Sequence, residues 1–379
     1  MGNINDYLRW RGDILFSEEY PYNEIDALIF ARMSYLRFNM IDFVEGDTIG
    51  IISNKMKDIA NEDFIFNGDK ELITLLGKSK RFKDLVVTDY EEVVDVEVEK
   101  QFGAITIHLP NNIIYISYIG TDMSITGWKE DFNMAFLKEI PAQKDGLKYA
   151  IKVANKYPNK KIRMGGHSKG GNVALYVALS LNTEIQNRII SVDNYDGPGF
   201  DEKMIQFKEN DEIRKRITTY IPQDSIIGRL FDHNEKHRII LSGAKGIMQH
   251  DIFSWKVSGT KFIDAKEMDY SSELINKTIK QWLNECSIEE RKVFIDSLFE
   301  MFSSTEASTF VEFSKIWSKK LPSIMNYYKE MSKEDRKSST ETLSKLIKTS
   351  FGIIKAEATN KIQSNKNKQN LEKKDFTNR

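Results

Sequence analysis

The stretch Arg163-Met-Gly-Gly-His-Ser168-Lys-Gly-Gly-Asn-Val-Ala-Leu-Tyr176 predicts a sharp turn between a strand and a helix. It contains the pattern G-x-S-x-G as Gly166-His-Ser-Lys-Gly170. Residues 161–164 are typical of a short strand, and apolar residues recur at helical spacing from 172 to 181. In this setting the glycines keep side chains away from the turn, so that the serine hydroxyl projects toward a base. We therefore predict that Ser168 is a catalytic nucleophile.

The residues around Ser168 also predict where an oxyanion would be stabilised. The helix that begins at Ser168 leaves its first N–H groups unpaired, so the backbone N–H of Lys169 is one expected donor. A second is expected from Thr121, which follows Gly120 at the end of a predicted strand. Both the N–H and the hydroxyl of Thr121 are candidates, and a solvated turn is the alternative. His167 is predicted to pack or to form a hydrogen bond beside the nucleophile.

Composition and charge exclude several classes of protein. A chain of 379 residues with 40% hydrophobic residues can bury a sizeable core, and its net charge of −1 gives no general attraction to nucleic acid. No apolar run approaches the roughly 18 residues that span a bilayer, and the first residues lack the features of a signal peptide. The single cysteine, Cys286, excludes an intrachain disulfide and fits a reducing compartment. We therefore predict a cytoplasmic protein.

The order of predicted elements indicates an α/β fold. Strands are expected at residues 94–99, 103–109 and 113–119, where polar and apolar residues alternate or turns intervene, so the sheet should begin antiparallel. Further strands are expected at 161–164, 188–195, 216–221 and 238–241, with helical patterns between several of them. Strands that alternate with helices predict a mostly parallel sheet covered on both faces.

The composition divides the chain into three predicted regions. An α/β domain covers residues 1–263. A helical region covers 264–359, where helix-start patterns such as Ser287 with Glu290 precede apolar stripes. A flexible basic tail covers 360–379. The C-terminal helices are expected to pack on one another or on the α/β domain, with a peripheral membrane or partner contact as the alternative.

A nucleophilic serine needs a histidine base and a carboxylate that orients this base. In this class of fold the acid and then the histidine follow the serine along the chain. His233 and His237 stand in a charged segment before the last strand, whereas His250 follows that strand and is the predicted base. Asp196 and Asp224 each follow a strand, and both remain candidates for the acid. No metal-ligand spacing or nucleotide-binding motif is present in the sequence, so no cofactor is predicted.

Several motifs together resemble the bacterial Mbeg-like family of α/β hydrolases, which is related to class 3 lipases. The resemblance covers most of residues 7–255 and implies the α/β-hydrolase fold. It departs from class 3 lipases at Ile119, where they typically carry Arg, and in the loop at 196–200, which only approximates their Gly-x-Pro-Arg. The segments that carry it are Tyr7-Leu-Arg-Trp-Arg-Gly-Asp13, Asn23-Glu-Ile-Asp26, Gly120-Thr-Asp122 with Trp128 and Asp131, Gly165-Gly-His-Ser-Lys-Gly-Gly-Asn172, and His250 with Trp255.

The resemblance implies roles for further residues. By similarity to class 3 lipases, Thr121 contributes to the oxyanion hole, Asp131 steadies it, and Asp224 is favoured as the acid. Asp196 is then expected to support its own Gly-Pro-Gly loop. The resulting hypothesis is a serine hydrolase that cleaves carboxylic esters, lipid esters among them. Thioesterase, amidase and acyltransferase chemistry use the same residues, and a binding or regulatory module is the alternative of another class.

Overall fold

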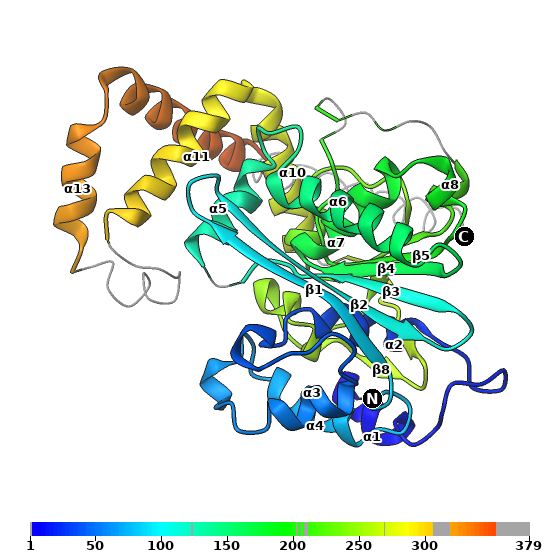
Figure 1. Cartoon of the computed structure of the whole chain (residues 1–379). Helices are drawn as coiled ribbons and strands as arrows, with labels where there is room; N and C mark the ends of the chain where they lie inside the picture. Colours follow the sequence, from blue (N-terminus) through cyan, green and yellow to red (C-terminus); the bar gives the residue numbers. More distant parts are fainter. Residues whose placement is uncertain are drawn as a thin grey trace, which may run out of the picture.

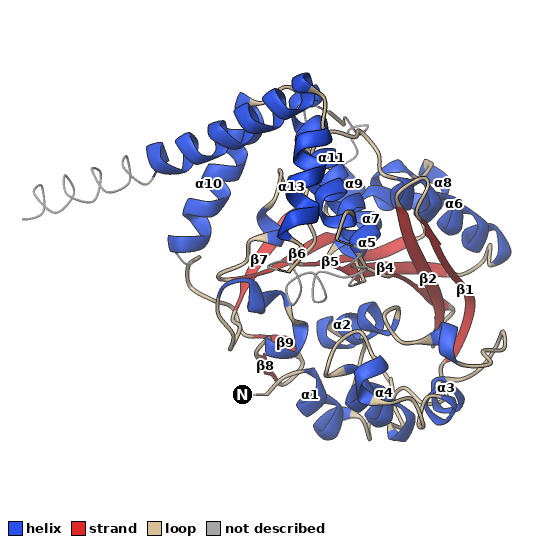
Figure 2. Cartoon of the chain, turned by 90° about the vertical axis from the view of Figure 1, so that its left-hand side faces the viewer, coloured by secondary structure: helices blue, strands red, loops and turns tan. Residues whose placement is uncertain are grey.

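In the computed structural model, seven strands form one sheet in the order of the chain, β1 to β7 (Figure 1 and Figure 2). The structure describes residues 2–122, 124–201, 204–205, 207, 211–268, 270–305 and 319–353. Neighbouring strands are antiparallel from β1 to β3 and parallel from β3 to β7, which confirms the predicted α/β-hydrolase fold. The strands are β1 (Val86–Asp95), β2 (Lys100–Leu109), β3 (Ile113–Tyr118), β4 (Lys161–His167), β5 (Ile189–Tyr195), β6 (Ile217–Pro222) and β7 (Lys236–Ile240).

The sequential strand order decides how the helices are layered. Right-handed crossovers between strands that advance in one direction place all crossover helices on the same face of the sheet. Figure 2 shows these helices on one face and the N-terminal helices on the other. The crossover helices are α6 (Pro141–Lys156), α7 (Lys169–Ser180), α8 (Thr183–Gln186) and α9 (Asp211–Arg214). The N-terminal helices are α1 (Ile4–Arg11), α2 (Glu24–Met33), α3 (Ile49–Lys55) and α4 (Asp69–Lys78).

Each face of the sheet has its own hydrophobic core. On the crossover side, Met164 of β4 packs with Val173 and Val177 of α7. On the N-terminal side, Phe30 of α2 packs with Tyr195, and Trp255 joins the same cluster. A short hairpin of β8 (Val257–Ser258) and β9 (Lys261–Phe262) also contributes to this second core. Because both faces are covered, the central strands are buried almost throughout.

The valine-rich segment before β2 differs from its prediction. The alternation of valine and acidic residues predicted a half-buried strand over residues 94–99. In the structure β1 begins earlier, at Val86, and ends at Asp95, so that residues 96–99 form the turn into β2. Val96 is 72% exposed and Val98 is 52% exposed. The alternation therefore marks the projecting tip of a hairpin, and the buried part of β1 lies further upstream at Val87.

The C-terminal helices pack on α5 (Ile125–Asn133), a helix that follows β3. Phe299 and Phe132 meet edge to face with ring centroids 5.4 Å apart, and the buried Cys286 joins the same hydrophobic cluster. The helices are α10 (Tyr270–Glu285), α11 (Ile288–Ser303) and α13 (Leu321–Glu330), and residues 333–353 are also helical. The predicted basic tail over 360–379 lies outside the described residues. The division at residues 263 and 359 stays a prediction.

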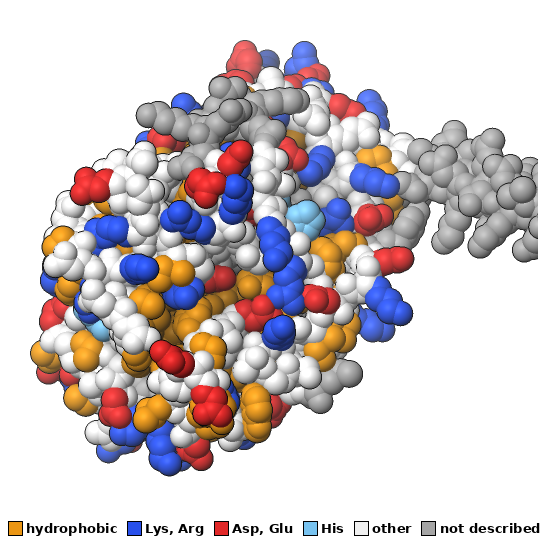
Figure 3. Space-filling model, turned by 90° about the vertical axis from the view of Figure 1, so that its right-hand side faces the viewer, with side chains coloured by type: hydrophobic (Ala, Val, Ile, Leu, Met, Phe, Trp, Pro, Cys, Tyr) orange, Lys and Arg blue, Asp and Glu red, His pale blue; other side chains and the backbone are white. Residues whose placement is uncertain are grey.

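The surface carries charges of both signs. On the face in Figure 3, Lys and Arg side chains are interspersed with Asp and Glu side chains, in keeping with the net charge of −1. Within the part of the chain that the structure describes, no helix has both the length and the apolar character needed to cross a membrane.

Candidate active site

Ser168 occupies a strained turn between β4 and α7. Its backbone has φ 58° and ψ −132°, a region that non-glycine residues rarely adopt and that costs about 1–3 kcal/mol. The flanking glycines are required by close backbone approach: a Cβ on Gly166 would lie 2.3 Å from the carbonyl carbon of Gly170, and one on Gly170 would lie 2.2 Å from the carbonyl oxygen of Tyr118. The predicted elbow is therefore present, and its hydroxyl is carried at the N-terminus of α7.

His250 is held by a carboxylate. The ring Nδ1 lies 2.6 Å from Oδ2 of Asp196, which follows β5 and is fully buried. The other oxygen of Asp196 accepts hydrogen bonds from the Ser225 hydroxyl at 2.5 Å and the Gly228 N–H at 3.2 Å. A carboxylate at Nδ1 keeps the proton on that nitrogen, so Nε2 is left as the acceptor that a general base needs.

The prediction that Asp224 orients His250 is wrong. Asp224 instead holds the loop that leads to His250, because its Oδ2 accepts from the Gly246 N–H at 2.5 Å. Its own N–H donates to Oε1 of Gln249, the residue before His250. Asp224 therefore anchors the backbone of the short helical turn Gly246–His250, and its carboxylate is engaged there.

The side chain that supports the Gly-Pro-Gly loop is that of Asn194 and not, as expected, that of Asp196. Asn194 Oδ1 accepts from the Gly197 N–H at 3.0 Å and its Nδ2 donates to the Gly197 carbonyl at 3.2 Å, so this amide supports the loop after β5. Strand register was the signal that could have identified the acid. Tyr195 stands opposite His167 in the β4–β5 pair, so the next residues, Asp196 and Ser168, leave the sheet side by side.

His167 connects the elbow to the backbone of His250. Its Nε2 donates to the His250 carbonyl at 2.8 Å, which confirms the expected hydrogen-bonding role. The centroids of the two imidazole rings are 4.4 Å apart. Burial and the neighbouring His250 and Arg32 hold the pKa of His167 well below its usual value, so the ring stays neutral. The hydroxyl of Tyr35 lies 3.2 Å from Nδ1 and 3.0 Å from the carbonyl oxygen of His167. Sequence reasoning missed Tyr35, because only the packing of the N-terminal layer brings it here.

The predicted oxyanion donors lie on both sides of the elbow. Lys169 is the first residue of α7, where a helix has no internal partner for the backbone N–H. The Thr121 hydroxyl donates to Asp131, as the resemblance implied. Since that single hydroxyl proton is engaged, the backbone N–H of Thr121 is the group left for an oxyanion. Burial raises the pKa of Asp131 to about 6, and the nearby Lys169 counteracts this.

Ser168, His250 and Asp196 thus gather at the carboxyl ends of β4, β5 and β7. Among the residues that the structure describes, no hydrogen bond joins the Ser168 hydroxyl to the His250 ring. Such bonds are often long in the free state and tighten when substrate binds. Across the same described residues, no three His, Cys, Asp or Glu side chains are grouped to hold a metal ion. The arrangement can therefore support nucleophilic attack, proton transfer and oxyanion stabilisation by side chains and backbone.

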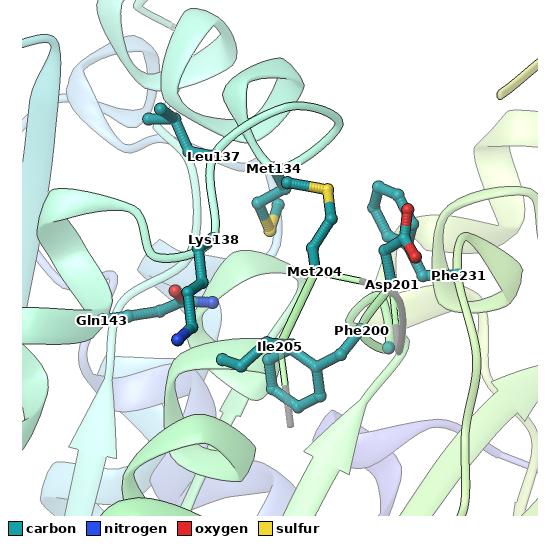
Figure 4. A pocket seen from close by; sticks show the side chains of 10 residues that line it. Met134, Leu137, Lys138, Gln143, Phe200, Asp201, Met204, Ile205 and Phe231 are labelled. Atoms are coloured by element: carbon teal, nitrogen blue, oxygen red, sulfur yellow. The ribbon is translucent and has the colours of Figure 1, made fainter. Parts of the chain in front are cut away.

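A small pocket adjoins the next turn of α7. Asn172, four residues after Ser168 and so on the same helix face, donates to the carbonyls of Pro198 and Gly199 and accepts from Gln143. Gln143 and Gly199 line a pocket with about 270 Å³ of empty volume, part of it open to solvent (Figure 4). The remaining lining is mainly apolar: Met134, Leu137, Phe200, Met204, Ile205 and Phe231, with Lys138 and Asp201.

The sheet, the elbow and the His–Asp pair define a protein of the α/β-hydrolase fold class. Residues 76–300 match the Mbeg1-like family, and since this match spans more than half of the chain, the chain belongs to the Mbeg1-like family. A comparison with curated proteins gave no match.

The chain is also similar to several solved structures. MDLA from Penicillium cyclopium, in a mutant form, is 14% identical, with 68% of this chain and 91% of that chain covered and a TM-score of 0.37. The Rhizomucor miehei lipase propeptide complex is 15% identical, with 63% and 81% covered and a TM-score of 0.33. Lip2 lipase from Yarrowia lipolytica is 13% identical, with 58% and 80% covered and a TM-score of 0.31.

Proposed function

We propose that the protein is a serine hydrolase that cleaves carboxylic esters through an acyl-enzyme. The observation that carries this proposal is the contact between His250 Nδ1 and the buried Asp196 at 2.6 Å, beside a serine held with φ 58° in an elbow. A strained nucleophile, an oriented base and unpaired N–H groups are the parts that acyl transfer requires. Each of these parts is expensive to maintain without a chemical role, because strain and buried charge both cost stability.

In the proposed mechanism, Ser168 attacks the ester carbon while His250 Nε2 accepts the hydroxyl proton. Asp196 stabilises the imidazolium that forms and keeps its orientation. The N–H groups of Lys169 and Thr121 hold the oxyanion of the tetrahedral intermediate. His250 then returns the proton to the leaving alcohol, which leaves the acyl group on Ser168. Water activated by the same histidine attacks this acyl-enzyme and regenerates the serine.

The apolar pocket favours an ester with a short apolar group. Its empty volume of about 270 Å³ includes space open to solvent, so it is a shallow depression, and Met134, Phe200 and Phe231 are among the apolar residues that line it. The connection through Asn172 puts this pocket one helical turn from the nucleophile. The proposed substrates are therefore small-molecule or lipid esters that present an acyl or alcohol group of limited width.

Hydrolysis of p-nitrophenyl esters tests the proposal. The wild-type protein should hydrolyse them with a burst of nitrophenol equal to the enzyme concentration if deacylation is slow. Ser168→Ala should lower kcat by several orders of magnitude. Ser180→Ala, at the far end of the same helix, is the matched control and should leave the rate unchanged. A wild-type rate equal to that of Ser168→Ala would refute the proposed activity.

A comparison of esters with acyl chains of different length tests whether this pocket binds substrate. Met134→Trp adds volume inside the lining, so kcat/KM for hexanoate relative to acetate should fall, while the acetate rate stays close to the wild-type rate. An unchanged preference between the two esters would remove this pocket from the substrate site without touching the assignment of Ser168.

A further inference from the structure

The side chain of Lys169 is buried inside the protein. It is 1% exposed, and its Nζ donates to Glu130 Oε2 at 2.7 Å, to Gln101 Oε1 at 2.7 Å and to the Gln101 carbonyl at 2.8 Å. Since an ammonium group has three protons, every donor of Lys169 is used. Lys169, Glu130 and Gln101 together form the Lys169 network.

The other two members reach the opposite side of the oxyanion region. Gln101 Nε2 donates to the Gly120 carbonyl at 3.2 Å, directly before Thr121. Glu130 accepts from the backbone N–H groups of Gln101 at 3.0 Å and Ala142 at 2.8 Å, so its carboxylate is fixed on three sides. The next residue of α5, Asp131, accepts the Thr121 hydroxyl. The network therefore joins the residue that carries one oxyanion N–H to the peptide group that contains the other, because the Gly120 carbonyl and the Thr121 N–H belong to the same peptide.

Stability alone is a poor reason for such a network. Desolvating an ammonium and a carboxylate is costly, and buried ion pairs can often be replaced by apolar side chains without loss of stability. What apolar residues cannot reproduce is the direction of the hydrogen bonds from Lys169 through Gln101 to Gly120. An oxyanion hole requires its two donors at fixed positions before the reaction, because reorganisation during the reaction would remove the catalytic gain.

We propose that the Lys169 network sets the spacing of the two oxyanion donors, with Glu130 and Gln101 as positioning residues. This inference rests on the proposed hydrolase function and adds to it. Lys169 then has two tasks: its backbone N–H binds the oxyanion, and its side chain fixes the partner donor at Thr121. The network is expected to affect the transition state more than the binding of substrate, because the oxyanion exists only after attack.

Gln101→Met is the mildest test. Methionine has a similar length but makes no hydrogen bond to Gly120, while the Lys169–Glu130 ion pair remains. We expect kcat for p-nitrophenyl esters to fall by about 10-fold or more with KM within about twofold. Gln101→Glu, which restores an acceptor for Lys169 but no donor to Gly120, should remain impaired. A kcat unchanged in Gln101→Met would overturn the proposal.

A charge-neutral double variant tests the ion pair without leaving a charge unpaired. Lys169→Met with Glu130→Gln should lower kcat by roughly 100-fold, again with little change in KM. The matched control is Arg81→Met with Asp26→Asn, which removes another fully buried ion pair in the N-terminal layer. This control should lower Tm and leave kcat at 20 °C within about twofold. Equal losses of kcat in both double variants would show that the Lys169 network only stabilises the fold, which would contradict the positioning role.

Amide hydrogen exchange examines the network independently of activity. In Gln101→Met, exchange should accelerate in peptides that contain Gly120 and Thr121, while the core of β4 and β5 keeps its protection. If the wild-type protein lacked esterase activity, the proposed function would fail, yet this exchange pattern would still decide whether the network fixes the two segments. Unchanged exchange at residues 118–122 would overturn the positioning role even in an active enzyme.

Discussion

The carboxylate that holds His250 can be identified at the scale of single residues. Asp196 has φ 53°, which turns its backbone sharply at the end of β5 and directs the side chain toward His250. Asp224 lies after the next strand and binds the loop backbone instead. We therefore expect different losses of kcat when each of the two residues is changed to asparagine.

Asp196→Asn should lower kcat on the order of 10⁴-fold, because an amide in this position favours the wrong tautomer of His250 and cannot stabilise the imidazolium. Asp224→Asn keeps an oxygen for the Gly246 N–H, so we expect a loss of kcat below about 10-fold and a small decrease in Tm. Steady-state kinetics of both variants checks this prediction. A large loss confined to Asp224→Asn would restore the assignment made from the sequence.

At the scale of elements, Arg291 of α11 links the residues that follow α5 to the preceding helix α10. Arg291 is buried, and its guanidinium donates to the Ala135 carbonyl at 2.8 Å and to the Leu283 carbonyl at 3.1 Å. It also pairs with Asp201 at 3.3 Å. Since α5 carries Glu130 and Asp131, the C-terminal helices contact the element that supports the proposed oxyanion region.

Arg291→Met should therefore destabilise the protein by about 1–3 kcal/mol, because two buried carbonyls lose their donors. Amide exchange should accelerate locally at residues 132–137. Lys292→Met is the control, since its ion pair with Asp296 is half exposed and should contribute little. Denaturant unfolding measures both variants, and equal stabilities for the two would contradict the fastening role of Arg291.

Elements that a local sequence pattern specifies are the ones that the sequence predicts best. Periodicity and glycine placement were enough to predict the elbow, the antiparallel start of the sheet and its parallel strands, because periodicity and glycine placement are local patterns in the sequence. The position of Tyr35 and the contact of α11 with α5 depend on packing between segments far apart in the chain, which no local pattern records. The acid was misassigned because both candidates follow strands, and only the β4–β5 register separates them.

At the scale of the whole molecule, buried carboxylates make stability depend on pH. Burial raises the pKa of Asp193 to about 7, although Arg163 opposes this shift. Because the pKa of Asp193 in the folded protein lies above the ordinary value of 3.8, the native state binds more protons than the unfolded state between pH 3.8 and about 7. The contribution of Asp193 is therefore fully present below pH 3.8 and is lost as pH rises through about 7.

Asp193→Asn should remove this dependence. Relative to the wild type, the variant should gain stability as pH rises from about 4 to about 7, by an amount on the order of 4 kcal/mol, and the difference should then level off. Urea unfolding at a series of pH values provides the measurement. A stability difference between the two proteins that stays constant over this range would show that Asp193 titrates alike in both states.

The central claim is that Ser168 is an activated nucleophile, and covalent labelling by a fluorophosphonate tests it most directly. Such probes react with a serine only when a base and an oxyanion hole assist it. Mass spectrometry of the labelled wild-type protein should find one adduct, on the peptide that contains Ser168, and none in Ser168→Ala. An unlabelled wild-type protein, or an adduct that persists in Ser168→Ala, would contradict the account.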